Sequence, residues 1–266
     1  MLLLKMFAIF LVTCVSVDRR KGPKIDFGGG YLKIRTLGGG ASAVAYEVTK
    51  GGKRYALKKA KSKGNILDRE FSVLKEFLTD VGIPKAHELF KCRDGTDCLV
   101  LELVGPSLAD LHKNSRSTDI WPIETIGAIA IQLIDRMQTV HRRGYVHGDL
   151  FGNNVSPGRG DDRGTVYAID FGQAELARGP NARSRSFDAQ SIVSTVANML
   201  KHSKTRSGVL SELGDLIKHV EIAKERGDKF LDYDYMRELM ESMITRVGKR
   251  YTGNVSWPAE ILRKLP

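Results

Sequence analysis

The 266-residue sequence has no internal repeat, no long low-complexity tract and no proline-rich linker. These absences argue against solenoids and against several modules joined by flexible spacers. With 42% hydrophobic and 27% charged residues, the chain can bury one sizeable core and has little length left for accessory modules. The composition therefore indicates a single globular unit.

Long hydrophobic runs are also lacking. The run from Met6 to Val17 is 12 residues, whereas a membrane-spanning helix needs about 20. It follows Lys5 and ends in the small residues Cys14-Val15-Ser16, an order typical of a cleaved secretory signal over residues 1–17. An uncleaved anchor and an additional buried segment are the alternatives. We expect a secreted protein or one of the secretory lumen, with delivery to a host cell as a further destination, and no stable membrane association after cleavage.

Cysteine is scarce, with three residues in the chain, and signal cleavage would remove Cys14. The other two, Cys92 and Cys98, flank a segment in which Asp94-Gly95 separates two strand-like runs, which is a hairpin signal. A hairpin would place the two thiols across from each other on adjacent strands, close enough for a disulfide. In a reducing compartment the same pair would remain two inert thiols.

Negative charge is in deficit, since 42 Lys and Arg against 31 Asp and Glu give a net charge of +11. This balance favours acidic partners. The basic residues are scattered rather than interleaved with aromatic residues, which is typical of a solvated surface. We therefore predict no specific nucleic-acid partner.

Two polar motifs occur in order within the second half of the chain. Asp149 and Asn154 have the spacing of the kinase catalytic loop H-x-D-x-x-x-x-N, which begins here at His147. Downstream, a short apolar run ends in Asp170-Phe171-Gly172, as in a strand that precedes a metal-binding Asp. Either motif alone is weak, and the second alone could be a turn after a strand. Together, at this distance, they indicate phosphoryl transfer.

The first half of the chain supplies the matching nucleotide-binding parts. Leu37, Gly38 and Gly40 lie in a glycine-rich stretch between two strand-like runs, where backbone N–H groups can approach phosphates. Strand periodicity after Arg54 places Ala56 and Lys58 on one face and leaves Lys59 on the other as a surface charge.

Five helices and one carboxylate complete the pattern. Apolar spacing predicts a helix over 67–78, with Glu70 in its first half and paired with Lys58. Further helices are predicted after Trp121-Pro122 and at 188–202, 208–224 and 233–247.

Two stretches resemble the casein kinase 1 and vaccinia-related kinase group of protein kinases. They are Leu99 to Leu111, which contains Gly105-Pro106-Ser107-Leu108, and Asp232 to Leu239. The resemblance covers roughly residues 25–250 and implies an α+β, two-lobed protein-kinase-like fold. Its β-rich N-lobe would span 25–103 and its α-helical C-lobe 104–266.

The resemblance also implies roles for individual residues. Leu101 would be the gatekeeper, and the backbone of Glu102 and Val104 would hydrogen-bond adenine. Asp188 would open the central C-lobe helix and brace the catalytic loop.

The sequence departs from common kinases in three places. Gly148 replaces the arginine of His-Arg-Asp, which in many kinases receives a phosphorylated activation loop. Only 17 residues separate Asp170 from Asp188, and no Ala-Pro-Glu occurs there. Phe151 replaces the lysine that serine/threonine kinases use on the γ-phosphate, and the tract around it also resembles small-molecule kinases of the aminoglycoside and choline type.

These parts predict an ATP-dependent kinase that acts on a hydroxyl group, most simply Ser or Thr of proteins, including acidic or already phosphorylated ones. Asp149 accepts the hydroxyl proton, Asp170 and Asn154 hold Mg²⁺ (with Mn²⁺ as the alternative ion), and Lys58 binds the α- and β-phosphates. His147, Phe171, Gly172 and Asp188 are structural. A small-molecule kinase and a nucleotide-binding pseudokinase scaffold are the alternatives, and we expect a monomer.

Overall fold

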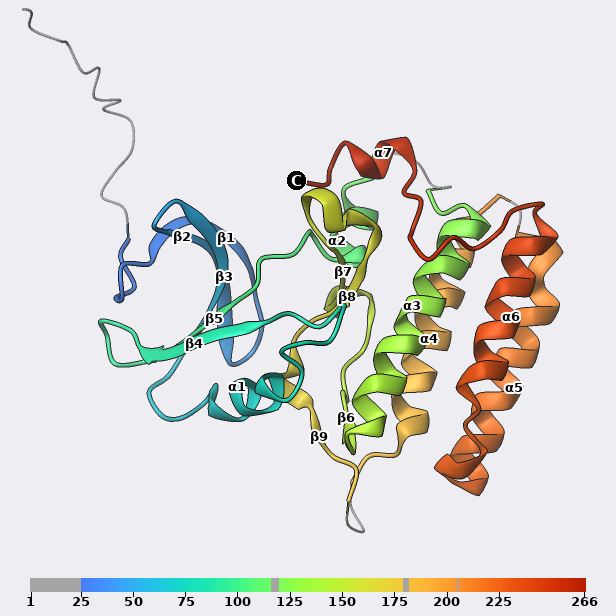
Figure 1. Ribbon diagram of the computed structural model, residues 1–266, viewed down its shortest axis with the longest axis horizontal. Helices are drawn as coiled ribbons and strands as arrows, with labels where there is room; N and C mark the ends of the chain where they lie inside the picture. Colours follow the sequence, from blue (N-terminus) through green and yellow to red (C-terminus); the bar gives the residue numbers. More distant parts are fainter. Residues whose placement is uncertain (1–24, 116–119, 179–181, 205) are drawn as a thin grey trace, which may run out of the picture.

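The computed structural model describes residues 25–115, 120–178, 182–204 and 206–266 (Figure 1). The predicted signal segment 1–17 lies outside the described residues. A strand-rich lobe is followed along the chain by a helical lobe, so the predicted α+β, two-lobed kinase-like fold is confirmed. No helix within the described ranges is long and apolar enough to cross a membrane.

The N-terminal lobe is built on a five-stranded antiparallel sheet of order β1-β2-β3-β5-β4. The strands are β1 Leu32–Gly39, β2 Ala43–Lys50, β3 Lys53–Ala60, β4 Ala86–Lys91 and β5 Asp97–Leu101. The β2–β3 hairpin turns through Gly51 and Gly52, whose φ values of +57° and +78° suit a two-residue turn of the mirror-image type. This turn sets the register that pairs Ala45 with Lys58 across the two strands.

Helix α1, Asp68–Lys75, packs below this sheet and is shorter than the predicted 67–78. The backbone N–H groups of Glu76 and Phe77 donate to carbonyls three residues earlier, which tightens the last turn and ends the helix. Phe77 is nevertheless fully buried, and its ring lies 5.8 Å from that of Phe171 in the other lobe.

The β4–β5 hairpin carries the predicted disulfide between Cys92 and Cys98, whose Cα atoms are 5.6 Å apart. The expected position of the two thiols directly across from each other is wrong. Cys98 pairs with Phe90 in the strand register, whereas Cys92 lies one residue beyond β4 and its N–H donates to the carbonyl of Thr96. The turn between them needs Gly95, whose φ is +81°, and it places Cys92 diagonally from Cys98 rather than opposite it.

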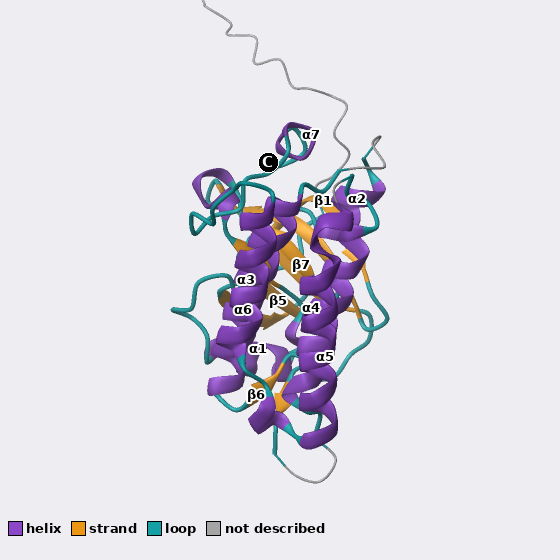
Figure 2. Ribbon diagram, turned by 90° about the vertical axis from the view of Figure 1, so that its right-hand side faces the viewer, coloured by secondary structure: helices purple, strands orange, loops and turns teal. Residues whose placement is uncertain are grey.

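The C-terminal lobe is organised around α3, Ile123–Arg142, which is buried on most of its surface. This helix packs against α4 and α6 and against a small hairpin, and Figure 2 shows the long helices side by side. The other helices are α2 Leu108–Lys113, α4 Arg185–Leu200, α5 Leu210–Arg226, α6 Tyr233–Arg246 and α7 Ala259–Leu262. The helices predicted at 188–202, 208–224 and 233–247 correspond to α4, α5 and α6 with shifts of a few residues.

Short elements between α3 and α4 carry the polar motifs. They are the paired strands β6 Tyr145–Val146 and β9 Glu175–Leu176, the paired strands β7 Val155–Pro157 and β8 Val166–Ala168, and the 3₁₀ turns η1 Gly152–Asn154, η2 Gly160–Gly164 and η3 Phe171–Gln173. Two further 3₁₀ turns, η4 Arg206–Val209 and η5 Asp228–Phe230, connect the later helices. The motif loops thus lie between the two lobes.

Candidate active site

Lys58 joins the two lobes at the centre of the site. Its ammonium group lies 2.7 Å from Glu70 Oε2 on α1 and 2.6 Å from Asp170 Oδ1 in the C-terminal lobe. The Lys58 side chain is 17% exposed, and that of Glu70 is 2% exposed. The predicted pairing of Lys58 with Glu70 is therefore present, and Asp170 shares the same ammonium group.

These contacts shift the ionisation of all three groups. Burial disfavours the charged form of Lys58, but the two carboxylates outweigh it and raise the pKa of Lys58. Burial raises the pKa of Glu70, although the Lys58 charge opposes this shift. Burial also tends to raise the pKa of Asp170. The charge and the hydrogen bond of the Lys58 ammonium group outweigh this effect, so the pKa of Asp170 is lowered. Lys58 and Asp170 are thus held as ions where the two lobes meet.

Asp170 has an unusual backbone. Its φ of +63° makes it the one non-glycine residue with positive φ in the part of the chain that the structure describes. The Asp170 carboxylate accepts from the Gly172 N–H, 3.2 Å away, which stabilises the left-handed turn. Such strained conformations occur at functional sites. Phe171, fully buried, anchors the turn by packing edge-on against the His147 ring at 4.6 Å.

The catalytic loop is held together by Asn154. Its amide nitrogen donates to Asp149 Oδ2 at 2.7 Å and to the Asp149 carbonyl at 2.8 Å. The carbonyl of Asn154 accepts from the N–H of Ile169, the residue before Asp170. These bonds bring the two motifs together, so Asp149, Asn154 and Asp170 lie in adjacent loops. Their arrangement suits a reaction centre that needs a base and a metal.

Buried hydrogen bonds between Asp188 and the backbone around His147 support the catalytic loop. Asp188, in the first turn of α4, is fully buried and accepts from the N–H groups of His147 at 2.7 Å and Gly148 at 2.9 Å. Its carboxylate also contacts His141 Nε2 at 2.8 Å, and these contacts outweigh burial and lower the pKa of Asp188. Burial lowers the pKa of His147, so the imidazole is neutral. Asp188 thus lies where the resemblance implied it would.

Two strands line the side of the site where the resemblance implies that adenine binds. Ala56 on β3 pairs with Leu101 on β5, so both lie on the face that carries Lys58. The Glu102 N–H already donates to the Lys85 carbonyl, and the Gly105 N–H to the Pro157 carbonyl. Among the described residues, nothing bonds the Val104 N–H. In the chain after β5, the Glu102 carbonyl and the Val104 N–H are therefore available as acceptor and donor for the edge of an adenine base.

The glycine-rich hairpin covers the opposite side. Leu37, Gly38 and Gly40 are exposed where β1 turns into β2, and the Gly40 N–H donates to the Ala43 carbonyl. A Cβ added at Gly38 or Gly40 would meet no atom within 4 Å. The open space beside these backbones suits a bulky phosphate chain.

The donor chemistry fits a magnesium ion. Carboxylate and amide oxygens are ligands that Mg²⁺ prefers, and Asp170 and Asn154 each present one oxygen that is not used by a strong protein hydrogen bond. Groups of three or more His, Cys, Asp or Glu side chains that could form a closed metal cage are absent from the described ranges. A nucleotide-bridged metal needs no such cage, because phosphate oxygens supply the other ligands.

Sequence reasoning missed two supporting residues. His141, in the last turn of α3, bonds Asp188, and the Tyr167 hydroxyl lies 3.4 Å from Glu102 Oε1. Both lie 47 or more positions from their partners. The helix and strand periodicity around His141 and Tyr167 predicts which face each side chain occupies but does not indicate these distant partners.

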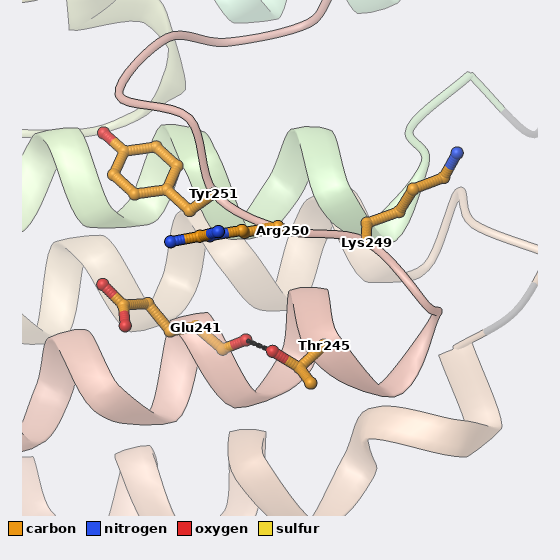
Figure 3. A pocket seen from close by; sticks show the side chains of 5 residues that line it. All are labelled: Glu241, Thr245, Lys249, Arg250 and Tyr251. Atoms are coloured by element: carbon orange, nitrogen blue, oxygen red, sulfur yellow. Dashed lines mark hydrogen bonds between the residues drawn. The ribbon is translucent and has the colours of Figure 1, made fainter.

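A hollow of about 550 Å³ lies away from this site, beside the end of α6. It is lined by Glu241, Thr245, Lys249, Arg250 and Tyr251 (Figure 3). None of the predicted site residues lines it, and it takes no part in the chemistry described here.

The fold and this site define a protein-kinase-like domain. The model of the RIO domain family matches residues 44–203, more than half of the chain. The chain therefore belongs to the RIO domain family, within the protein kinase superfamily. The expected placement in the casein kinase 1 and vaccinia-related kinase group is not the family that the match shows.

The chain is also similar to a casein kinase I homolog of Schizosaccharomyces pombe. The two are 27% identical over 168 residues, which cover 60% of this chain and 38% of the yeast protein. The chain thus spans well under half the length of this curated relative.

Proposed function

We propose that this protein transfers the γ-phosphoryl group of ATP to a hydroxyl group, with Ser or Thr of proteins as acceptors. One observation carries the proposal: Lys58 contacts Glu70 and Asp170 at the same time, at 2.7 and 2.6 Å. Kinases that are competent for transfer need both the lysine–glutamate pair and the metal-binding Asp in place. A scaffold that only binds a partner has no use for this geometry.

Each residue has one task in the proposed reaction. Lys58 binds the α- and β-phosphates, and Glu70 orients its ammonium group. Asp149 accepts a hydrogen bond from the acceptor hydroxyl, orients it towards the γ-phosphate and takes its proton. Asn154 and Asp170 hold Mg²⁺ or Mn²⁺, which supplies neutralisation of phosphate charge when it is bound.

The acceptor class rests on two features. The likeness to a yeast casein kinase I homolog favours a protein acceptor, and the net charge of +11 favours acidic or phosphorylated segments. Phe151 favours a second candidate, a small-molecule kinase, because a 40% exposed phenyl ring stands where serine/threonine kinases have a lysine. The same catalytic residues would serve both acceptors.

We also infer that the protein acts as a monomer in the secretory lumen or beyond it. The Cys92–Cys98 disulfide supports this compartment, because disulfides persist in oxidising environments.

The test is incubation of the purified protein with labelled ATP, Mg²⁺ or Mn²⁺, and separate pools of acidic proteins and small hydroxyl metabolites. We expect label on Ser or Thr of protein and none with Asp149→Asn. Label only in the metabolite pool would establish the second candidate. No transfer to either pool, with nucleotide still bound, would identify a pseudokinase.

A further inference from the structure

Gly148 leaves a space beside the catalytic loop that another residue fills. Its φ is +79°, and a Cβ added there would lie 2.5 Å from Arg183 Nη1 and 2.9 Å from the Gln173 carbonyl oxygen. In kinases with His-Arg-Asp, an arginine side chain begins at this position. Here the guanidinium group of Arg183, from the segment that precedes α4, occupies the space beside Gly148.

Arg183 ties together three points of that segment. Its Nη1 donates to the Gln173 carbonyl at 3.0 Å, and its backbone N–H donates to Glu175 Oε1 at 3.0 Å. Its guanidinium carbon lies 5.6 Å from the Phe187 ring centroid, in the first turn of α4. Gln173 ends the turn that begins at Asp170, and Phe187 precedes Asp188. One side chain thus connects the metal-binding turn to the helix that braces the catalytic loop.

This arrangement reverses a common regulatory device. In many kinases the catalytic loop carries the arginine, and the activation segment acquires a phosphate that the arginine binds. In this chain the segment carries the cation, which lies beside Gly148, and the acceptor is a backbone carbonyl of the same segment that is always present. No added charge is needed to complete the contact.

We propose that Arg183 is a positioning residue that holds residues 173–175 and 182–187 together beside Gly148 of the catalytic loop and thereby replaces activation by phosphorylation. This inference rests on the proposed phosphoryl transfer and names the regulation of that same site. Arg183 acts through Gln173 and the loop rather than on the nucleotide.

The test compares Arg183→Ala, Arg183→Lys and the control Arg178→Ala in the full chain. Arg178 is an exposed arginine of the same segment, and its side chain makes no hydrogen bond or ion pair with another described residue. For Arg183→Ala we expect kcat to fall by about tenfold or more with KM for ATP little changed, since small displacements near the reacting groups are costly. Arg183→Lys should restore part of kcat, because an ammonium group can still donate to the Gln173 carbonyl. Arg178→Ala should match the wild type.

Amide hydrogen exchange provides a readout that does not need activity. Arg183→Ala should lose protection in 173–178 and 182–187 but not in α3 or α6. Wild-type kcat together with wild-type exchange in this variant would overturn the inference. If the wild type transfers no phosphate, the proposed function fails, and the exchange comparison alone still decides whether Arg183 holds the segment. If Arg183→Ala does not fold, the same comparison is made with Arg183→Lys. Unchanged kcat and unchanged exchange in Arg183→Lys would then count against a role of the guanidinium group.

Discussion

Asp149 and Asp170 are two carboxylates in adjacent loops with different surroundings. Asp170 is paired with Lys58, whereas Asp149 is hydrogen-bonded by the neutral amide of Asn154. In the proposed reaction, Asp170 holds the metal and Asp149 takes the proton, and their different surroundings suit these two roles. Asp170→Ala should therefore abolish binding of the metal–nucleotide complex. Asp149→Asn should retain nucleotide binding and lose transfer by orders of magnitude.

Calorimetric titration with Mg²⁺ and a non-hydrolysable ATP analogue, together with transfer of label from ATP, measures both effects. Asp161→Asn is the control, because Asp161 is exposed in η2 and bonds no described side chain. Unchanged turnover in both Asp149→Asn and Asp170→Ala would refute the assignment of these residues.

Gly148 is a second position where a single substitution should have a clear effect, here on the stability of the fold. Its positive φ and the Gln173 carbonyl, a backbone atom that cannot move away easily, leave no room for a side chain. Gly148→Ala should lower the free energy of unfolding by more than about 1 kcal/mol. Gly214→Ala should instead raise it by about 0.5–1 kcal/mol, because Gly214 lies within α5 and an added Cβ would meet no atom within 4 Å. Urea denaturation of the two variants checks the contrast, and equal effects would contradict it.

The residue scale also shows where strand periodicity is insufficient. Strand periodicity predicts that Lys59 lies on the face opposite Lys58, with a solvated surface charge. The Lys59 ammonium group is instead paired with a carboxylate. Lys59 is 21% exposed and lies 2.6 Å from Asp94 of the next hairpin. Alternation decides the face of a side chain, whereas the neighbouring hairpin decides what covers it.

At the scale of elements, the β4–β5 hairpin combines a tight turn with a covalent link. The link closes a loop of few residues, so it removes little entropy from the unfolded chain. Replacing both cysteines with alanine should lower the free energy of unfolding by an amount near the low end of the roughly 0–5 kcal/mol range for disulfides. Mass spectrometry under non-reducing conditions should find the Cys92–Cys98 bridge in protein recovered from the secretory route. Two free thiols on a chain that still begins at Met1 would argue against export.

The segment between η3 and α4 is the second element with a testable property. In its described parts, Arg183 donates to the Gln173 carbonyl and the Glu175 carboxylate, and Arg69 of α1 donates to the Ala174 carbonyl. None of these contacts needs a modification. The protein should therefore be fully active as first synthesised. Treatment with a phosphatase before the assay should leave the rate unchanged, and a large loss of activity would show that a phosphate contributes.

At the scale of the whole molecule, histidines set the acid limit of stability. Burial lowers the pKa of His87, His112, His147 and His219 below the ordinary value of 6.5. Between the folded and unfolded pKa values the unfolded chain binds more protons, so acid favours unfolding. Stability should be constant above about pH 7 and should fall as the pH drops below about 6.5. Urea denaturation between pH 8 and pH 5 measures this, and a flat profile would show that these histidines stay accessible when folded.

The sequence alone determined the class of fold and most of the residues proposed for the chemistry. The spacing of Asp149 and Asn154, the turn after Asp170 and the alternation around Lys58 are local properties, and local geometry follows from them. The tertiary structure decided which distant groups meet. Asp170 and Glu70 share one ammonium group, His141 supports Asp188, and Arg183 fills the space beside Gly148. These contacts join residues that lie far apart in the sequence, and they depend on how the lobes and α4 pack. No periodicity along the chain records that packing, because burial and charge compensation arise only once the elements are assembled.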